Sequence, residues 1–258
     1  MSAGGIQSAE RVSQRDVTDN YVFQRSLLAY CHAAGIVSGD VLEIGTGSGY
    51  GISVISPRAH RFVTLDKHPL SPVADHGRNV EFIQMAVPPM CGIPSCSFDF
   101  VIMFQVIEHI RDDFKMVKEI VRVLRPGGKL IISTPNRRMS LTRNPWHVRE
   151  YTADEFKNLL RSYFSEVEAK GVFGNEKAME YYEANKRSVA KISRLDLLKV
   201  QKWLPRPLLR IPYDIMNRIN RRKLHSNNKE LTEGITMDDY HIGPVNDYCF
   251  DLLYIAEK

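Results

Sequence analysis

Apolar and polar positions divide this chain into short apolar runs that alternate with longer segments of helical period. Seven apolar runs have the length of strands: 41–44, 61–65, 80–85, 97–105, 130–133, 166–173 and 248–256. Segments 20–34, 112–124 and 152–163 instead carry apolar side chains three and four positions apart, the spacing of an amphipathic helix. Strands alternating with helices predict an α/β protein with a mostly parallel sheet that is covered by helices on both faces.

Residues 174–247 interrupt this alternation between the sixth and seventh predicted strands. Apolar residues at helical spacing predict a helix over 179–202, and residues 203–213, from Trp203 onward, mix prolines, bulky apolar side chains and arginines. We therefore expect one domain made of 1–173 and 248–258. Residues 174–247 would be a basic helical insertion that forms a lid or a subdomain on the substrate side.

Three glycines stand on alternate positions directly after the first predicted strand. Gly45, Gly47 and Gly49 predict a tight turn, because glycine readily takes positive φ and lets the backbone lie against a ligand. A helix expected near residues 50–55 would point its free N–H groups at the same place. The spacing does not fit G-x-G-x-x-G, since Tyr50 and Ile52 stand where the third glycine belongs. A nicotinamide-dependent oxidoreductase is therefore disfavoured.

An acidic residue ends the second predicted strand, about 20 residues past the glycine turn. Asp66 is placed there to accept hydrogen bonds from both ribose hydroxyls of a nucleotide-like cofactor. Nucleotide cofactors bind at the carboxyl edge of such sheets, where the third and fourth strands end at Met85-Ala86 and Phe104-Gln105.

Three motifs at these positions resemble those of class I S-adenosylmethionine-dependent methyltransferases of the UbiG-like, methyltransferase type 11 group. They are Glu43-x-Gly45-x-Gly47-x-Gly49, Phe98-Asp99-x-Val101 followed by Glu108-His109, and Leu124-Arg125-Pro126-Gly127-Gly128. The resemblance implies a Rossmann-like sheet of seven strands, antiparallel only at the last, and S-adenosylmethionine as cofactor. The residues that it assigns to the cofactor are Glu43, Gly45, Thr46, Gly47, Gly49, Asp66, Lys67, Met85, Ala86, Phe104 and Gln105.

Two further expectations depend on this resemblance. The leading helix 20–34 would cover the cofactor, so that Tyr21 and Arg25 could reach its amino-acid end, although both also suit a plain packing helix. Many members carry an acid for the adenine amino group where this chain has Met85-Ala86. Adenine would then be held by backbone groups and apolar contact.

Methyl transfer from a sulfonium is an in-line displacement that gains mainly from positioning, and a hydroxyl acceptor also benefits from a base. His147 is the first candidate because it lies in the loop after the fifth strand, beside Trp146 and Arg149. His109 and Glu108 are further candidates, as is Glu150. A packing or solvent-facing role is the alternative for each histidine. Glu108, His109 and His147 could meet in space, but no cluster of ligands dictates a metal and none is predicted.

The acceptor is the least determined part of the prediction, because the fold serves oxygen, nitrogen and carbon methylation alike. We expect O-methylation of a small-molecule, glycan or lipid-linked acceptor. The alternatives are C-methylation of a quinone-type ring and a non-catalytic cofactor-binding module.

Charge is concentrated in the insertion. Although the whole chain carries only +5, segment 186–229 holds thirteen Lys/Arg against Asp196 and Asp214. Bulky apolar residues beside these cations suit peripheral contact with an anionic membrane surface. The alternatives are a solvated basic face over an apolar core and contact with an anionic soluble substrate. Nucleic acid is unlikely as a partner, because Trp203 and Tyr213 are the segment's few aromatic residues.

The remaining composition predicts a cytoplasmic protein, with peripheral membrane contact as a further option. No run of 18 apolar residues occurs, and the first residues lack the layout of a signal peptide. Residues 1–15 are polar and are expected to be frayed. Cys31, Cys91, Cys96 and Cys249 form no C-x-x-C pair and are expected to be reduced thiols.

Overall fold

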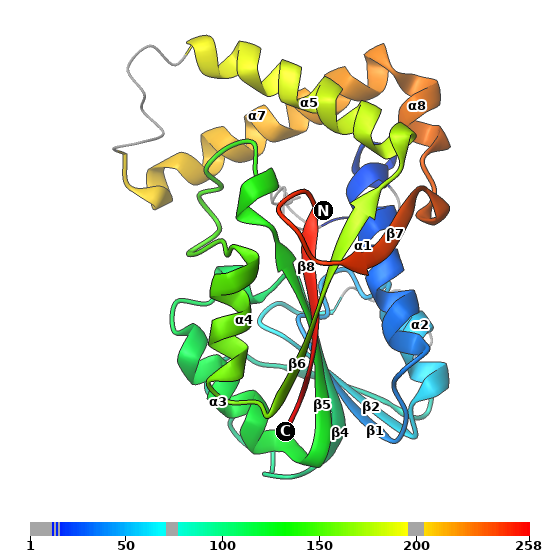
Figure 1. The fold of residues 1–258 in the computed structure, drawn as a ribbon, viewed down its shortest axis with the longest axis vertical. Helices are drawn as coiled ribbons and strands as arrows, with labels where there is room; N and C mark the ends of the chain where they lie inside the picture. The colour runs from blue at the N-terminus through cyan, green and yellow to red at the C-terminus, as the bar shows by residue number, and fades with distance from the viewer. Residues whose placement is uncertain (1–11, 13, 15, 71–76, 196–203) are drawn as a thin grey trace, which may run out of the picture.

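A computed structural model describes residues 12, 14, 16–70, 77–195 and 204–258. Its centre is an eight-stranded sheet in the order β3-β2-β1-β4-β5-β8-β6-β7 (Figure 1). The first five strands are parallel, whereas β8 runs antiparallel between β5 and β6. The strands are β1 Asp40–Ile44, β2 Arg61–Asp66, β3 Val80–Gln84, β4 Phe98–Phe104, β5 Leu124–Pro135, β6 Glu166–Gly174, β7 Tyr240–Pro244 and β8 Asp251–Glu257.

Helices cover both faces of this sheet, with α1 and α2 on one side and α3 and α4 on the other (Figure 1). The α-helices are α1 Asn20–Ala34, α2 Ile52–Ile55, α3 Asp113–Val123, α4 Ala153–Arg161, α5 Glu176–Leu195, α7 Arg206–Asn227 and α8 Lys229–Gly234. Single 3₁₀ turns are η1 Val17–Asp19, η2 Ser56–Arg58, η3 Ile107–His109, η4 Arg137–Met139 and η5 Met237–Asp239. The predicted α/β class is confirmed.

The eighth strand corrects the expected count of seven. β7 lies inside the segment expected to be helical and pairs antiparallel with β6 at the edge of the sheet. It has only five residues and ends at Pro244, which an edge strand tolerates because its outer N–H groups need no partner. Such a short strand has no apolar run long enough to predict it.

The ends of several elements also differ from the sequence prediction. β5 begins at Leu124, so the Pro-Gly-Gly stretch lies within the strand, where a bulge against β4 and a Gly127 φ of 75° accommodate it. The closing strand begins at Asp251 and not at 248, and α2 begins at Ile52. α4 opens with the predicted capping box between Thr152 and Glu155.

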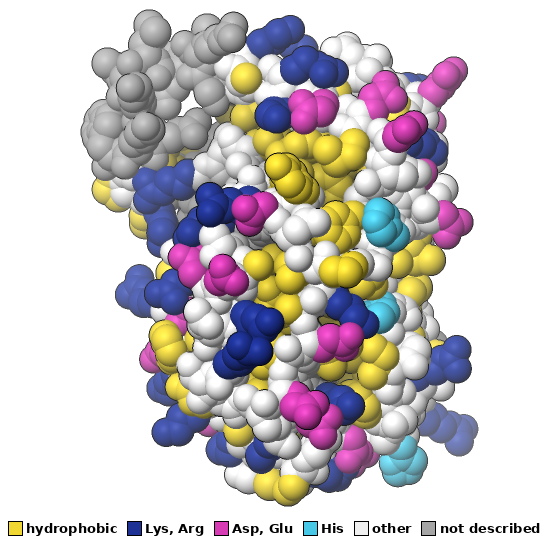
Figure 2. Space-filling model, in the orientation of Figure 1, with side chains coloured by type: hydrophobic (Ala, Val, Ile, Leu, Met, Phe, Trp, Pro, Cys, Tyr) yellow, Lys and Arg dark blue, Asp and Glu magenta, His cyan; other side chains and the backbone are white. Residues whose placement is uncertain are grey.

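The insertion comprises α5, α7, α8 and β7. Figure 1 shows its helices as a layer across the end of the sheet to which β5 and β6 point. The predicted helix 179–202 is represented by α5, while residues 196–202 and Trp203 lie outside the described residues, as do most of residues 1–15. None of the described helices is both long and apolar enough to cross a membrane. Basic and acidic side chains are interspersed on the face shown in Figure 2.

Candidate active site

The glycine turn after β1 has the predicted conformation. Gly45, Gly47 and Gly49 have φ values of 93°, 58° and 85°, in the region that favours glycine. A Cβ at Gly45 would lie 2.3 Å from Cγ2 of Val106, so the turn packs closely there. A Cβ at Gly47 would meet nothing nearer than a backbone oxygen at 4.0 Å. The backbone at Gly47 therefore faces open space.

That space is a cavity of about 1130 Å³ at the carboxyl ends of β1, β2 and β4. It is large enough for a nucleoside cofactor together with part of an acceptor. Nine of the eleven predicted cofactor residues line it: Gly45, Thr46, Gly47, Asp66, Lys67, Met85, Ala86, Phe104 and Gln105. Glu43 and Gly49 do not.

Glu43 lies behind the glycine turn, on the face of β1 that packs against α1. It is 1% exposed and accepts hydrogen bonds from the hydroxyls of Tyr30, at 2.7 Å, and Thr64. Burial raises the pKa of its carboxyl to about 7. The carboxylate thus ties α1 to β1 and β2 beneath the turn, and its contact with a cofactor stays a prediction. Gly49 likewise faces Leu70, whose Cδ1 would lie 3.2 Å from an added Cβ.

Asp66 supports the turn from the end of β2. Its Oδ2 accepts a hydrogen bond from the backbone N–H of Gly47, and its Oδ1 accepts one from that of His68, both at 2.8 Å. A carboxylate has about four acceptor positions, so both oxygens keep capacity for ribose hydroxyls. Asp66 is half-buried and lines the cavity, and its contact with the ribose stays a prediction.

Arg25 and Asp251 form a buried ion pair in the wall of this cavity. The Arg25 Nε lies 2.7 Å from Oδ2 of Asp251, and burial raises the pKa of the Asp251 carboxyl. Arg25 thus reaches the cavity as expected, while Tyr21 lines a second cavity. No role was predicted for Asp251, and the available signal was one charged residue inside an apolar strand.

The three predicted catalytic residues lie together at the carboxyl edge of the sheet. Glu108, His109 and His147 each offer one ligand atom within 4.8 Å of the others, an arrangement that would also suit a metal ion. Glu108 is buried and accepts a hydrogen bond from the Thr134 hydroxyl at 3.1 Å. The ring of His109 lies edge-on to that of His147, with centroids 5.0 Å apart. The expected absence of a metal stays a prediction.

His147 is held by two side chains of its own loop. Its Nδ1 lies 2.7 Å from Oε1 of Glu150, and its Nε2 lies 2.8 Å from the amide nitrogen of Asn144. With a carboxylate at Nδ1, that nitrogen carries the proton and Nε2 is the acceptor. His109 is oriented in the same sense, since its Nδ1 lies 3.1 Å from the Trp146 carbonyl.

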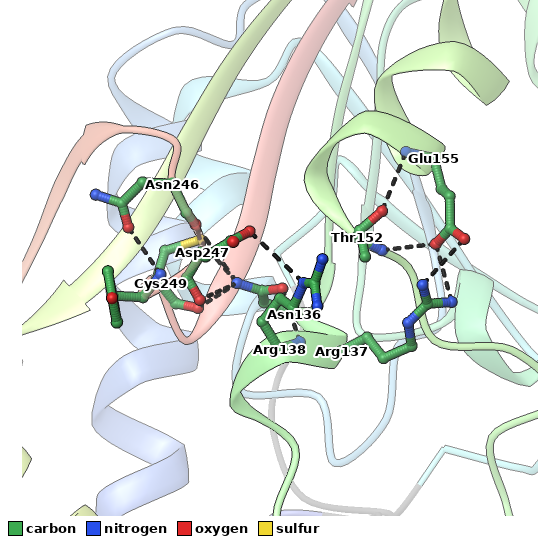
Figure 3. Close-up of polar contacts among 9 residues, drawn as sticks. Asn136, Arg137, Arg138, Thr152, Glu155, Asn246, Asp247 and Cys249 are labelled. Carbon is green, nitrogen blue, oxygen red and sulfur yellow. Dashed lines mark hydrogen bonds and ion pairs between the residues drawn. The ribbon is translucent and has the colours of Figure 1, made fainter.

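The loop that carries His147 is anchored at both ends (Figure 3). At its start, the buried Asn136 amide donates hydrogen bonds to the carbonyls of Asp247, at 3.2 Å, and Cys249, at 2.9 Å, which fixes the β7–β8 connection. Arg137 pairs with Glu155, the residue that caps α4 together with Thr152. The histidine is thereby fixed relative to the sheet.

A second cavity of about 350 Å³ lies between the core and the insertion. Aromatic rings and amides from both parts form its wall. They include Tyr21, Asn136, Asn144, Tyr181, Tyr182, Asn185, Tyr213, Asn217 and Phe250. His147, Arg25 and Asn144 line both cavities. The histidine therefore stands where the two spaces meet.

Contacts far apart in the sequence seat α7 on this site. Asp214 accepts a hydrogen bond from Trp146 Nε1 at 3.0 Å, and the Arg210 guanidinium lies 4.4 Å from the centroid of the same ring. The Arg206 guanidinium donates to the Val148 carbonyl at 2.9 Å. The sequence prediction gave Asp214 no role, although it is the one acid within α7.

Part of the basic charge of the insertion is neutralised by the core. Arg218 and Arg221 both donate to Oδ1 of Asp19, a fully buried carboxylate just before α1. These arginines are therefore structural and do not contribute to a free cationic surface.

Comparison with known proteins gives the site its family context. Residues 18–173 match the model of a methyltransferase domain. A protein from Mycolicibacterium smegmatis named "probable S-adenosylmethionine-dependent methyltransferase" is 37% identical over 64% of this chain and 68% of its own. A ubiquinone biosynthesis O-methyltransferase from Idiomarina loihiensis is 28% identical over 41% of this chain and 46% of its own. A SAM-dependent methyltransferase structure from Thermotoga maritima has a TM-score of 0.55 and 15% identity, with 92% of each chain covered.

Proposed function

Because this chain belongs to the methyltransferase domain family and is an S-adenosylmethionine-dependent enzyme, we propose that it methylates a hydroxyl oxygen of a small-molecule, glycan or lipid-linked acceptor. The observation that carries the proposal is the position of His147, which lines both cavities and is paired with Glu150 at 2.7 Å. The likeness to an O-methyltransferase named for ubiquinone biosynthesis also favours oxygen as the acceptor atom.

The larger cavity fits S-adenosylmethionine. Gly47 leaves room that a Cβ would fill, Asp66 offers carboxylate oxygens to the ribose, and Met85 and Ala86 form an apolar wall for adenine. This chain has Met85-Ala86 where many related enzymes carry an acid, so adenine recognition depends on backbone groups and apolar contact. Arg25 and Asp251 provide opposite charges for the amino-acid end. When bound, the cofactor supplies an electrophilic methyl group on a sulfonium.

The second cavity is the proposed acceptor site. Rings such as Tyr181 and Phe250 give apolar walls, whereas Asn185 and Asn217 supply donors and acceptors for hydroxyl groups. An acceptor held there directs a hydroxyl toward His147. The cofactor in the larger cavity and the acceptor in the second cavity are then held next to each other for the displacement.

His147 would act as the general base. Glu150 holds the proton of the ring at Nδ1, which leaves Nε2 to accept the proton of the acceptor hydroxyl. In this account the hydroxyl takes the place of the Asn144 amide, which lies 2.8 Å from Nε2. Glu150 also stabilises the imidazolium that forms. Glu108 and His109 serve to position this ring.

The test is radiolabelled methyl transfer to separate pools of quinols, glycosides and polyprenyl-linked glycosides, with the product linkage identified by mass spectrometry. His147→Gln should lower turnover about 10²- to 10⁴-fold, the usual contribution of a general base, and leave S-adenosylhomocysteine affinity unchanged. His241→Gln, at an exposed histidine of β7, is the matched control. Full turnover by His147→Gln would contradict the proposal, and a carbon-linked methyl group would favour C-methylation of a quinone-type ring instead.

A further inference from the structure

One side of α7 presents a line of exposed apolar side chains. Leu208, Ile211, Ile215 and Ile219 are 63%, 66%, 45% and 53% exposed. Their spacing of three and four residues places them on one face of the helix. We call these four residues the outer face of α7.

This face is unlike the rest of the described surface. The other large apolar side chains that are strongly exposed there are Met216, which is also on α7, and Val17, Phe114 and Tyr248, which lie on other parts of the chain. Single exposed apolar residues are ordinary, but a contiguous line of them marks a contact site.

The opposite side of the same helix lines the proposed acceptor cavity through Leu209, Tyr213, Asn217 and Asn220. α7 therefore separates this cavity from the outer face. A surface that bound the outer face would lie one helix diameter, about 10 Å, from the acceptor cavity.

The charge of α7 indicates what that surface is. The helix has six Lys/Arg residues, and its one acid, Asp214, is buried and bonded to Trp146. Arg218 and Arg221 bind Asp19 of the core. Arg222 and Lys223 are exposed and follow Ile219 by three and four positions, so they extend the outer face. A partner that binds this face should present apolar groups to Leu208, Ile211, Ile215 and Ile219. It should present anionic groups to Arg222 and Lys223, near the C-terminal end of α7.

We propose that the outer face of α7 docks on an anionic lipid bilayer. The Leu and Ile side chains enter the boundary of the acyl chains, and Arg222 and Lys223 lie among anionic headgroups. A second copy of this chain fits less well, because the same helix has no exposed acid to pair with Arg222 and Lys223. Docking itself is independent of the proposed methyl transfer. Its consequence, that a lipid-linked acceptor enters beside α7, rests on the proposed function.

Cosedimentation of the full chain with vesicles tests the docking. Wild type should bind vesicles of phosphatidylcholine mixed with phosphatidylglycerol, and bind pure phosphatidylcholine more weakly. The double variant Ile211→Glu/Ile215→Glu should lose about tenfold or more in affinity, because each buried Ile contributes strongly to insertion. Phe114→Glu, an equally apolar exposed position on α3, is the matched control and should bind as wild type. Arg222→Ala/Lys223→Ala should weaken binding only to the anionic vesicles.

The proposal would be overturned if wild type stayed in solution with both kinds of vesicle. It would also be overturned if the Ile211→Glu/Ile215→Glu variant bound as tightly as wild type. Dimerisation in light scattering that Ile215→Glu abolishes, without vesicle binding, would assign the face to a second copy. Circular dichroism of each variant checks that the fold is kept. Because vesicle binding needs no turnover, its failure and a failure of methyl transfer are distinguished directly.

Discussion

At the scale of single residues, the site is built from backbone geometry and buried polar groups. Gly47 is required where the backbone faces the cavity, and Asp66 holds that same peptide through its N–H at 2.8 Å. Both were predictable from sequence, because a glycine turn followed about 20 residues later by an acid is a recognisable pattern of cofactor-binding sites. Glu43 belongs to the same motif, yet its carboxylate is used beneath the turn. The motif alone could not distinguish a ligand contact from a support.

The burial of Glu43 has a measurable consequence for stability. Its folded-state pKa of about 7 lies above the ordinary value of 4.5, so between these values the folded protein binds more protons than the unfolded chain. Stability should therefore fall as pH rises from 4.5 to about 7 and lose nothing more above it. Relative to wild type, Glu43→Gln should gain stability across this window, on the order of 3 kcal/mol.

Urea denaturation of both proteins at a series of pH values measures this difference. Glu81→Gln, at an exposed carboxyl of β3, provides the control. A difference between Glu43→Gln and wild type that stays constant across pH would show that the Glu43 carboxyl is not protonated in the folded state.

At the scale of elements, the insertion acts as a cover whose contacts join distant parts of the chain. Helix spacing predicted α5 in outline, and the capping box located the start of α4. Hydrophobic periodicity could not predict that Asp19 binds Arg218 and Arg221, since the two sides are about 200 residues apart. Nor could it predict β7, whose pairing with β6 depends on the tertiary fold.

The contact between Asp214 and Trp146 should hold α7 over the site. Asp214→Ala removes a buried partner of the indole N–H, a change that typically costs about 1–3 kcal/mol. Amide hydrogen exchange should become faster in α7 and in the loop of His147, with little change in β4 and β5. Asp238→Ala, at an exposed acid of η5, is the control and should leave exchange in α7 unaltered. Exchange in α7 that is equally slow in the Asp214 variant would show that other contacts suffice to seat the helix.

At the scale of the whole molecule, the fold places two cavities next to each other, and His147 is one of eight residues that line both. The larger cavity lies at the carboxyl ends of the neighbouring strands β1 and β4, where the strand order reverses. This switch point is the usual place for ligands in open α/β sheets. The apolar runs predicted this edge, and nine of the eleven residues that the motifs assigned to the cofactor line the cavity there. The second cavity depends on how the insertion packs against the core, so no local pattern in the sequence marks it. The nature of the acceptor is undetermined by sequence for the same reason.

The most direct test of this account is calorimetric titration of S-adenosylhomocysteine into wild type, Gly47→Ala and Gly92→Ala. Both glycines have positive φ, 58° and 79°, and neither has a side chain within reach of an added Cβ, so the backbone strain is matched. Gly47 lines the large cavity, whereas Gly92 lines neither cavity. The account predicts tight binding by wild type and Gly92→Ala and loss of about tenfold or more by Gly47→Ala. Equal binding by all three proteins, or none by wild type, would contradict it.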